Sequence, residues 1–198
     1  MSTKIKAIAL AIALAGASTS ASAAVITFEG FPDLTVFTTQ DFGSGVTFAG
    51  AQILALGGTL NPQFPPNSGV NVVFNPSGPM TLVFNTDVDF FSGFFTYNQP
   101  LTITAFDLAD MVVDTAAGAC NANFIGAGTG CMENEFVSVS APGAIRKVVI
   151  AGGGGNNFTL DDASFTGAID PNVPEPAAIA LLLGGLAAAG AIGRRRAR

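Results

Sequence analysis

The chain has 198 residues, of which 49% are hydrophobic and only 11% charged, whereas roughly 25% are charged in an ordinary soluble domain. It contains no histidine and no tryptophan, which excludes Ser-His-Asp and Cys-His catalysis and the HExxH type of zinc site. The net charge of −6 argues against a nucleic-acid partner, because such a partner requires a basic face that neutralises phosphates.

The charges divide the chain into three parts. All eight basic residues lie in three groups, at positions 4–6, 146–147 and 194–198. Residues 24–173 hold 13 of the 14 acidic residues and only two basic ones, a net charge of −11. This pattern predicts two basic, apolar, membrane-facing ends around one soluble domain.

Residues 1–23 have the pattern of a secretory signal peptide. Lys4 and Lys6 form a positive start, residues 7–15 (AIALAIALA) are apolar, and Ala21 and Ala23 fit the A-x-A rule of signal peptidase. The apolar run is too short to span a bilayer. We therefore predict a removable signal helix that signal peptidase cleaves after Ala23.

Residues 24–170 form the predicted secreted domain. Apolar and polar residues alternate with period 2 between frequent Gly and Pro breaks, and no segment has a 3.6-residue repeat long enough for a major helix. Short strands repeated at this spacing predict an all-β fold, an antiparallel β-sandwich. In chain order the expected strands are 25–29, 34–38, 45–49, 52–56, 70–74, 80–84, 88–97, 101–107, 111–115, 135–139, 145–150 and 158–165.

Cys120 and Cys131 are the only cysteines, and they lie 11 positions apart in a Gly/Asn-rich loop. Outside the inner membrane an even cysteine count indicates a disulfide, worth about 3 kcal/mol in the chain-entropy model. A metal pair is the competing interpretation, but it requires further soft ligands, and the chain has no histidine. We predict a disulfide between Cys120 and Cys131.

The carboxylates of the middle segment permit, in principle, a two-carboxylate glycosidase. The candidate pairs are Asp161 with Asp162 and Glu133 with Glu135. Adjacent residues on a strand point to opposite faces, so Asp161 and Asp162 are not expected to share a substrate. A simpler explanation is that the acidic residues provide the charged, solvated surface of a domain that has almost no lysine. We therefore predict that the chain is not an enzyme.

The last 28 residues, 171–198, have a three-part pattern of a short motif, an apolar run and a basic end. The run 177–193 would reach about 26 Å as a helix, the lower limit for a hydrocarbon core of roughly 30 Å, and a basic cluster after it stays on the cytoplasmic side. We predict a transmembrane helix at 177–193 that leaves residues 24–173 outside the inner membrane. The motif is Val173, Pro174, Glu175 and Pro176, and the basic end is Arg194, Arg195, Arg196 and Arg198.

This tail resembles the PEP-CTERM sorting signal of Gram-negative bacteria. The resemblance implies that an exosortase, a membrane-embedded cysteine transpeptidase-like protease, recognises Pro174, Glu175 and Pro176 and processes the chain near them. The inner-membrane anchor would then be transient, and the protein would be delivered to the cell surface or extracellular matrix. Such proteins often accompany exopolysaccharide production, which implies a structural or adhesive role in an exopolysaccharide or biofilm layer.

The two ends of the middle domain resemble those of jelly-roll carbohydrate-binding modules, with VITFEG at 25–30 and FTLDDASF at 158–165. In that family a Glu on the first strand and an Asp on the last hold one calcium ion, which prefers hard oxygen ligands. The resemblance implies that Glu29 and Asp161 or Asp162 are calcium ligands. The alternative is that Asp161 or Asp162 caps a strand end through backbone hydrogen bonds. A carbohydrate-binding module with structural calcium is thus the second functional hypothesis, and a surface hydrolase is the third.

Overall fold

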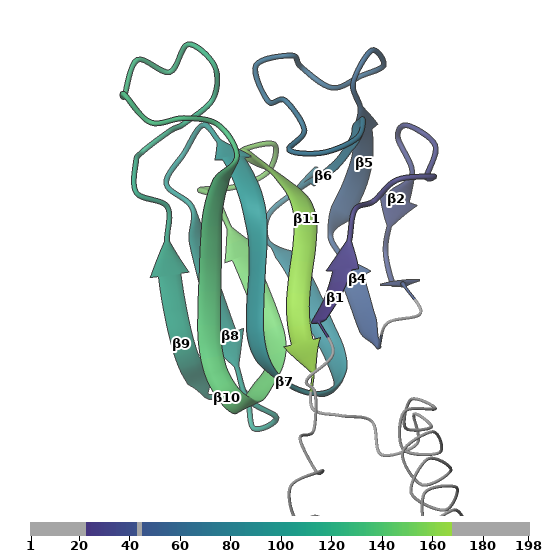
Figure 1. The fold of residues 1–198 in the computed structure, drawn as a ribbon, viewed down its shortest axis with the longest axis vertical. Helices are drawn as coiled ribbons and strands as arrows, with labels where there is room; N and C mark the ends of the chain where they lie inside the picture. Colours follow the sequence, from purple (N-terminus) through teal and green to yellow (C-terminus); the bar gives the residue numbers. More distant parts are fainter. Residues whose placement is uncertain (1–22, 43–44, 168–198) are drawn as a thin grey trace, which may run out of the picture. The chain divides into compact units, whose positions relative to one another are not determined.

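The computed structural model describes residues 23–42 and 45–167. These residues form antiparallel strands and contain no helix, which confirms the predicted all-β class (Figure 1). No helix in this part could cross a membrane, and the predicted signal helix and transmembrane helix lie outside it. The strands are β1 (Ala23–Ile26), β2 (Val36–Phe37), β3 (Gln40–Asp41), β4 (Val46–Ala49), β5 (Ala51–Ala55), β6 (Asn71–Phe74), β7 (Met80–Tyr97), β8 (Thr102–Phe106), β9 (Val112–Ala117), β10 (Glu135–Ala151) and β11 (Phe158–Gly167).

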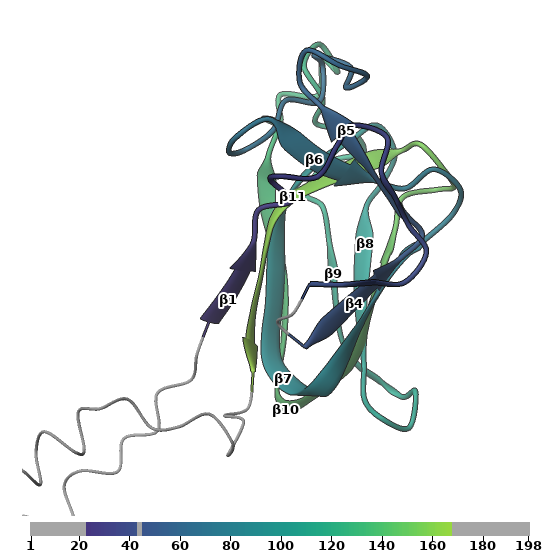
Figure 2. The same ribbon diagram turned by 90° about the vertical axis from the view of Figure 1, so that its right-hand side faces the viewer.

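Two long strands, β7 and β10, belong to both layers of the domain. They pair antiparallel from Glu135↔Phe95 to Ile150↔Met80 and bend together at the base of the molecule (Figure 2). The half of this pair that contains residues 88–97 of β7 continues through β11 into β6, β5 and β2, and β1 pairs with the end of β11. The other half continues through β8 into β9 on one side and pairs with β4 on the other. The sheet thus folds over itself into a sandwich.

A bulge in β10 accompanies the bend. The regular pairing with β7 is interrupted between Ser140 and Ile145. Pro142 has no N–H to donate to a ladder, and Gly143 has φ +65° and donates its N–H to the Asp89 carboxylate. The sequence analysis was wrong to divide these strands at 84–88 and 139–145, because both strands continue through the bend. In β10 the proline that would break an isolated strand is tolerated at a bulge.

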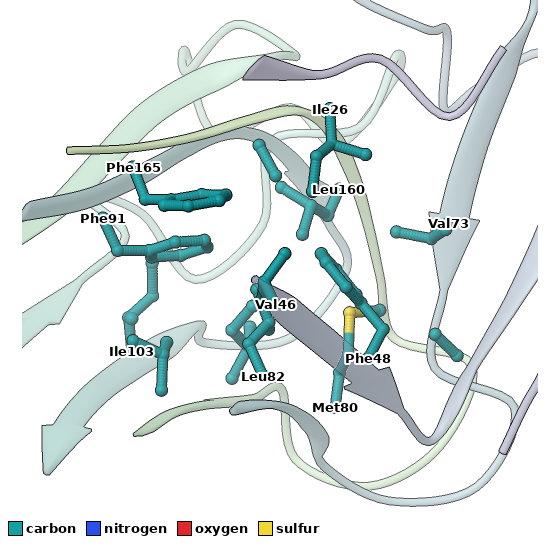
Figure 3. Packing of buried hydrophobic residues seen from close by; sticks show 14 of the residues in the cluster. Ile26, Val46, Phe48, Val73, Met80, Leu82, Phe91, Ile103, Leu160 and Phe165 are labelled. Atoms are coloured by element: carbon teal, nitrogen blue, oxygen red, sulfur yellow. The ribbon is translucent and has the colours of Figure 1, made fainter. Parts of the chain in front are cut away.

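The core lies between the two layers and combines aliphatic side chains with aromatic rings (Figure 3). Phe84 of β7 packs on Phe165 of β11 across the sandwich, with ring centroids 5.2 Å apart, and on Phe91 beyond the bend. Aromatic side chains each bury a large apolar area, so a few rings supply much of the hydrophobic stabilisation. The largest fully buried side chains include Phe28, Phe37, Phe48, Phe84, Phe91, Phe95, Tyr97 and Phe158.

The long loop between β9 and β10 is fastened at two points. Cys120 and Cys131 form the predicted disulfide, with Cα atoms 6.5 Å apart. Asn123, which is fully buried, accepts from the Tyr97 N–H at 2.6 Å and donates through Nδ2 to the Phe95 carbonyl at 2.9 Å. A buried carboxamide with both groups satisfied fixes the loop against the end of β7.

Replacing both cysteines (Cys120→Ser with Cys131→Ser) is expected to lower the free energy of unfolding by about 3 kcal/mol, because the crosslink restricts the unfolded chain. Urea denaturation of the oxidised protein and the double variant measures the difference. Reduced wild-type protein is the matched control, and it should unfold at the same urea concentration as the double variant. Equal midpoints for all three samples would contradict a stabilising disulfide.

Candidate functional site

The loop that joins β5 to β6, residues 56–70, is held by carboxyl groups from both ends of the domain. Asp161 and Asp162 of β11 bind its residues 67–68, and Glu29, which follows β1, binds at residues 70–71. We call these three side chains, Glu29, Asp161 and Asp162, the carboxylate clamp. The sequence analysis grouped the same three residues, and the structure brings them to one loop.

Asp161 and Asp162 reach the loop together because β11 is irregular at this point. Its pairing with β7 shifts between Asp161 and Ser164, and Asp162 has φ +47°. The expectation that the two side chains point to opposite faces is therefore wrong, since the alternation of a regular strand is lost at a bulge.

Together the two aspartates bind four donors from two loop residues. Asp161 Oδ2 accepts from the N–H groups of Asn67 and Ser68, at 2.7 and 2.8 Å. Asp162 accepts from Asn67 Nδ2 and Ser68 Oγ, both at 2.8 Å. The alternative interpretation was an aspartate that accepts hydrogen bonds from backbone N–H groups, and the two bonds of Asp161 are of that kind, whereas those of Asp162 come from side chains.

Glu29 completes the clamp from the other end of the chain. Its Oε1 accepts from the N–H groups of Val70 and Asn71, at 3.0 and 2.9 Å. The buried side chain of Asn71 donates in return to the carbonyls of Phe28 and Phe31. Glu29 lies beyond the end of β1, not on the first strand as the resemblance implied.

A fourth carboxyl group, which the sequence analysis missed, fastens the start of the same loop. Asp33 accepts from the Ala55 N–H at 2.9 Å and from both the N–H and the hydroxyl of Thr59. The hydroxyl bond is the main factor that lowers the pKa of Asp33. No local motif signals this contact, because Asp33 and Thr59 are separated by 26 positions.

Asp161 is the electrostatically unusual member of the clamp. It is only 1% exposed, and burial raises its pKa to about 6, opposed by the N–H bond from Ser68 and reinforced by the negative charge of Asp162. A buried carboxylate that lacks a cationic partner is stabilised only by its hydrogen bonds.

The clamp was also tested as the calcium site that the resemblance implied. Residues 23–42 and 45–167 contain no group of three or more His, Cys, Asp or Glu side chains placed to hold a metal ion. A calcium ion bound by these carboxylates would therefore also require carbonyl or hydroxyl oxygens of the loop. The calcium site stays a prediction, and the observed bonds already give each clamp residue a structural role.

In the other candidate carboxylate pair, Glu133 and Glu135, it is Glu135 that makes hydrogen bonds within the domain. Glu135 accepts a short hydrogen bond from the Tyr97 hydroxyl and another from the Ala119 N–H at 2.9 Å. Burial and the contact with Glu135 raise the pKa of Tyr97 to about 12. Glu135 thus anchors the disulfide loop to the core.

Comparison with known families concerns the C-terminal tail. A family described as the PEP-CTERM protein-sorting motif matches residues 172–197. The chain carries a PEP-CTERM sorting motif. This confirms the resemblance seen in the sequence and implies an exosortase-processed protein of the cell surface or extracellular space. Residues Val173 to Pro176, the arginine cluster and Ala21 lie outside the described structure.

Solved structures with similar folds include carbohydrate-binding-module-like sandwiches. The K2 cleaved adhesin domain of Lys-gingipain is 18% identical, with a TM-score of 0.43 over 74% of this chain and 99% of that one. A DUF4465 family protein from Bacteroides caccae is 14% identical, with a TM-score of 0.45 over 76% and 95%. A family 29 carbohydrate-binding module is 14% identical, with a TM-score of 0.35 over 79% and 100%. No curated protein matches the chain significantly.

The raised pKa of Asp161 predicts a loss of stability with rising pH. Its carboxyl group is protonated in both states at pH values well below the ordinary pKa of 3.8, but between about pH 4 and 6 it ionises in the unfolded chain and stays largely protonated in the folded one. In calcium-free buffer the wild type should therefore lose on the order of 2–3 kcal/mol relative to Asp161→Asn from pH 4 to pH 7. Urea denaturation across this range measures the difference, and parallel curves for the two proteins would refute the assignment.

The calcium prediction gives a separate thermal test. At calcium concentrations near one hundred times Kd, binding should stabilise the fold by about 2.7 kcal/mol, and a chelator should reverse the effect. Glu29→Gln and Asp161→Asn should abolish the shift, while Glu133→Gln, outside the clamp, should keep it. An unchanged melting midpoint with and without chelator would eliminate calcium.

Proposed function

We propose that the protein is an exported, non-enzymatic component of the cell surface or extracellular matrix, with a structural or adhesive role in an exopolysaccharide layer. The observation that carries the proposal is the sorting motif at residues 172–197. In this reading signal peptidase removes residues 1–23, the run 177–193 anchors the chain briefly in the inner membrane, and exosortase then processes the tail. Residues 24–170 are the part that is delivered.

The geometry of the domain supports this order of events. β1 pairs with β11 antiparallel, so Ala23 lies opposite Thr166 (Figure 1). The segments that lead to the predicted signal cleavage site and to the sorting motif therefore leave the domain from neighbouring positions. Both processing steps occur at a membrane, and a domain with adjacent ends can present both segments to it. The disulfide also suits an oxidising compartment.

The surface chemistry supports an adhesive role. On the outer face of the layer formed by β10, β7 and β11, Phe136 is 54% exposed and packs edge-on against its cross-strand partner Phe94. The next row across these strands is Ser138, Ser92 and Ser164, of which Ser138 and Ser164 are partly exposed and Ser92 is buried. The only basic residues in the described part, Arg146 and Lys147, lie beyond the bend of β10. A face with an exposed ring, hydroxyl groups and no basic residue suits contact with a neutral polymer.

The carboxyl groups support a non-enzymatic role. Three of the four carboxyl groups considered for catalysis are engaged in structural hydrogen bonds, Asp161 and Asp162 with the β5–β6 loop and Glu135 with Tyr97. A general acid or nucleophile must be free to approach its substrate. Asp161, Asp162 and Glu135 instead hold loops against the domain.

Changing the sorting motif should block delivery. In the native host, Pro174→Ala combined with Pro176→Ala should abolish the surface-bound form and leave an unprocessed chain in the inner-membrane fraction. The physical reason is that two prolines keep the segment extended and accessible beside the apolar run. Cell fractionation with intact-mass analysis measures both effects.

Pro171→Ala, just before the motif, is the matched control and should be delivered normally. The same strains also test the role in the matrix, because washed cells that carry the double variant should retain less exopolysaccharide. Normal surface delivery of the double variant would contradict the sorting route. If the wild-type protein is delivered normally but deletion of its gene leaves the amount of retained exopolysaccharide unchanged, the adhesive role is contradicted.

A further inference from the structure

A cleft of about 240 Å³ lies at the end of the sandwich where the clamped loop covers the sheet. One wall is the β5–β6 loop at residues 59–64, and the opposite wall is formed by β6, the start of β11 and the turns that follow β7 and precede β11. None of the residues that line the cleft carries a charge. Its volume is below the roughly 300–1,000 Å³ of common ligand pockets, which limits the occupant to a small group.

The polar lining consists of carboxamides and hydroxyls. The side chains of Asn98 and Asn156 make no hydrogen bond within the described residues, although both line the cleft. Asn98 Oδ1 is the single buried side-chain oxygen or nitrogen atom without a partner in this part of the chain. Buried polar atoms are nearly always paired, so an unpaired one beside a cleft marks a place where a water molecule, or a ligand toward which the side chain turns, supplies the donor.

The apolar lining is aromatic. Phe64 and Phe74 are both half-buried and contribute ring surface from opposite sides of the cleft. Phe64 is stacked on Phe124, with ring centroids 5.7 Å apart and an interplanar angle of 8°. A ring supported in this way keeps its orientation and presents a flat apolar face at low entropic cost.

Both walls are fixed before any ligand binds. Gln63 makes two hydrogen bonds with Ile125. Its carbonyl accepts from the Ile125 N–H at 3.0 Å, and its side-chain Nε2 donates to the Ile125 carbonyl at 3.1 Å. Across the cleft, the fully buried side chain of Asn75 donates to the Gly154 carbonyl and accepts from the N–H groups of Asn157 and Phe158. Fixed walls reduce the ordering cost of binding and thereby favour a specific ligand.

We propose that this cleft binds one neutral sugar ring, as an end or branch residue of a polysaccharide. Carboxamides both donate to and accept from hydroxyl groups, and the aromatic faces match the apolar face of a pyranose ring. The uncharged lining and the acidic domain around it disfavour uronic acids and sulfated sugars. The choice of a saccharide among neutral hydroxylated molecules rests on the proposed function in an exopolysaccharide layer.

The test uses the full chain in mild detergent and a panel of methyl glycosides of glucose, galactose, mannose and N-acetylglucosamine, with glucuronic acid as the anionic member. Ligand-observed and protein-observed NMR measure binding, and a single ring should bind in roughly the millimolar range. Asn98→Ala and Asn156→Gly should each weaken binding at least about tenfold; glycine keeps the positive φ of Asn156. Asn121→Ala, an exposed asparagine outside the cleft, is the matched control.

Binding of a neutral glycoside that shifts the resonances of residues 59–64 and is lost only in the cleft variants supports the proposal. Melting curves establish that the variants are folded, and either variant alone suffices for the comparison. Absence of binding for every neutral sugar, preference for glucuronic acid, or equal binding in all variants would overturn it. None of these results affects the sorting test, so a failure of the cleft is distinguishable from a failure of the export route.

Discussion

The hydrogen bonds that β11 makes with its neighbours hold the described domain together. β11 pairs with β7 along most of its length, with β6 near its start and with β1 near its end. Through β1 it joins the two ends of the domain, and through the irregularity at Asp161 and Asp162 it binds the loop between β5 and β6. The position of β11 thus determines where the chain enters and leaves the domain. It also determines where the β5–β6 loop is held.

The clamp and the cleft are consequences of this arrangement. Residues 67–71 are fixed by carboxyl groups, residues 55–59 by Asp33, and residue 63 by its exchange with Ile125. A loop fastened at three places behaves as part of the scaffold, so the ring of Phe64 and the hydroxyl of Thr59 are held above the sheet. Protonation of Asp161 or binding of a cation at the clamp would act on the cleft through this loop and through β11, whose first residues line the cleft.

The sequence predicted the features that depend on local pattern. Period-2 alternation and turn residues predicted most strands, cysteine count and compartment predicted the disulfide, and the three-part tail predicted the sorting motif. It did not predict that β7 and β10 each continue through a bend, because the bulge at Pro142 is stable only when β7 lies beside it. Nor did it predict that Asp161 and Asp162 act on one loop, which depends on a positive φ at Asp162. The cleft was missed because Asn98 and Asn156 are far apart in the sequence and are brought to one cleft by the pairing of β7 with β11, which the Asn98 N–H extends by donating to the Asn157 carbonyl.

The central claim is that residues 24–170 are a domain delivered outside the inner membrane and that both flanking segments are signals. The most direct measurement is the intact mass and location of the protein purified from its native host. The account predicts a surface or extracellular polypeptide that begins at Ala24, contains the intact Cys120–Cys131 disulfide and ends near Glu175. A full-length 19.9 kDa chain in the cytosol, still ending in its arginines, would contradict it.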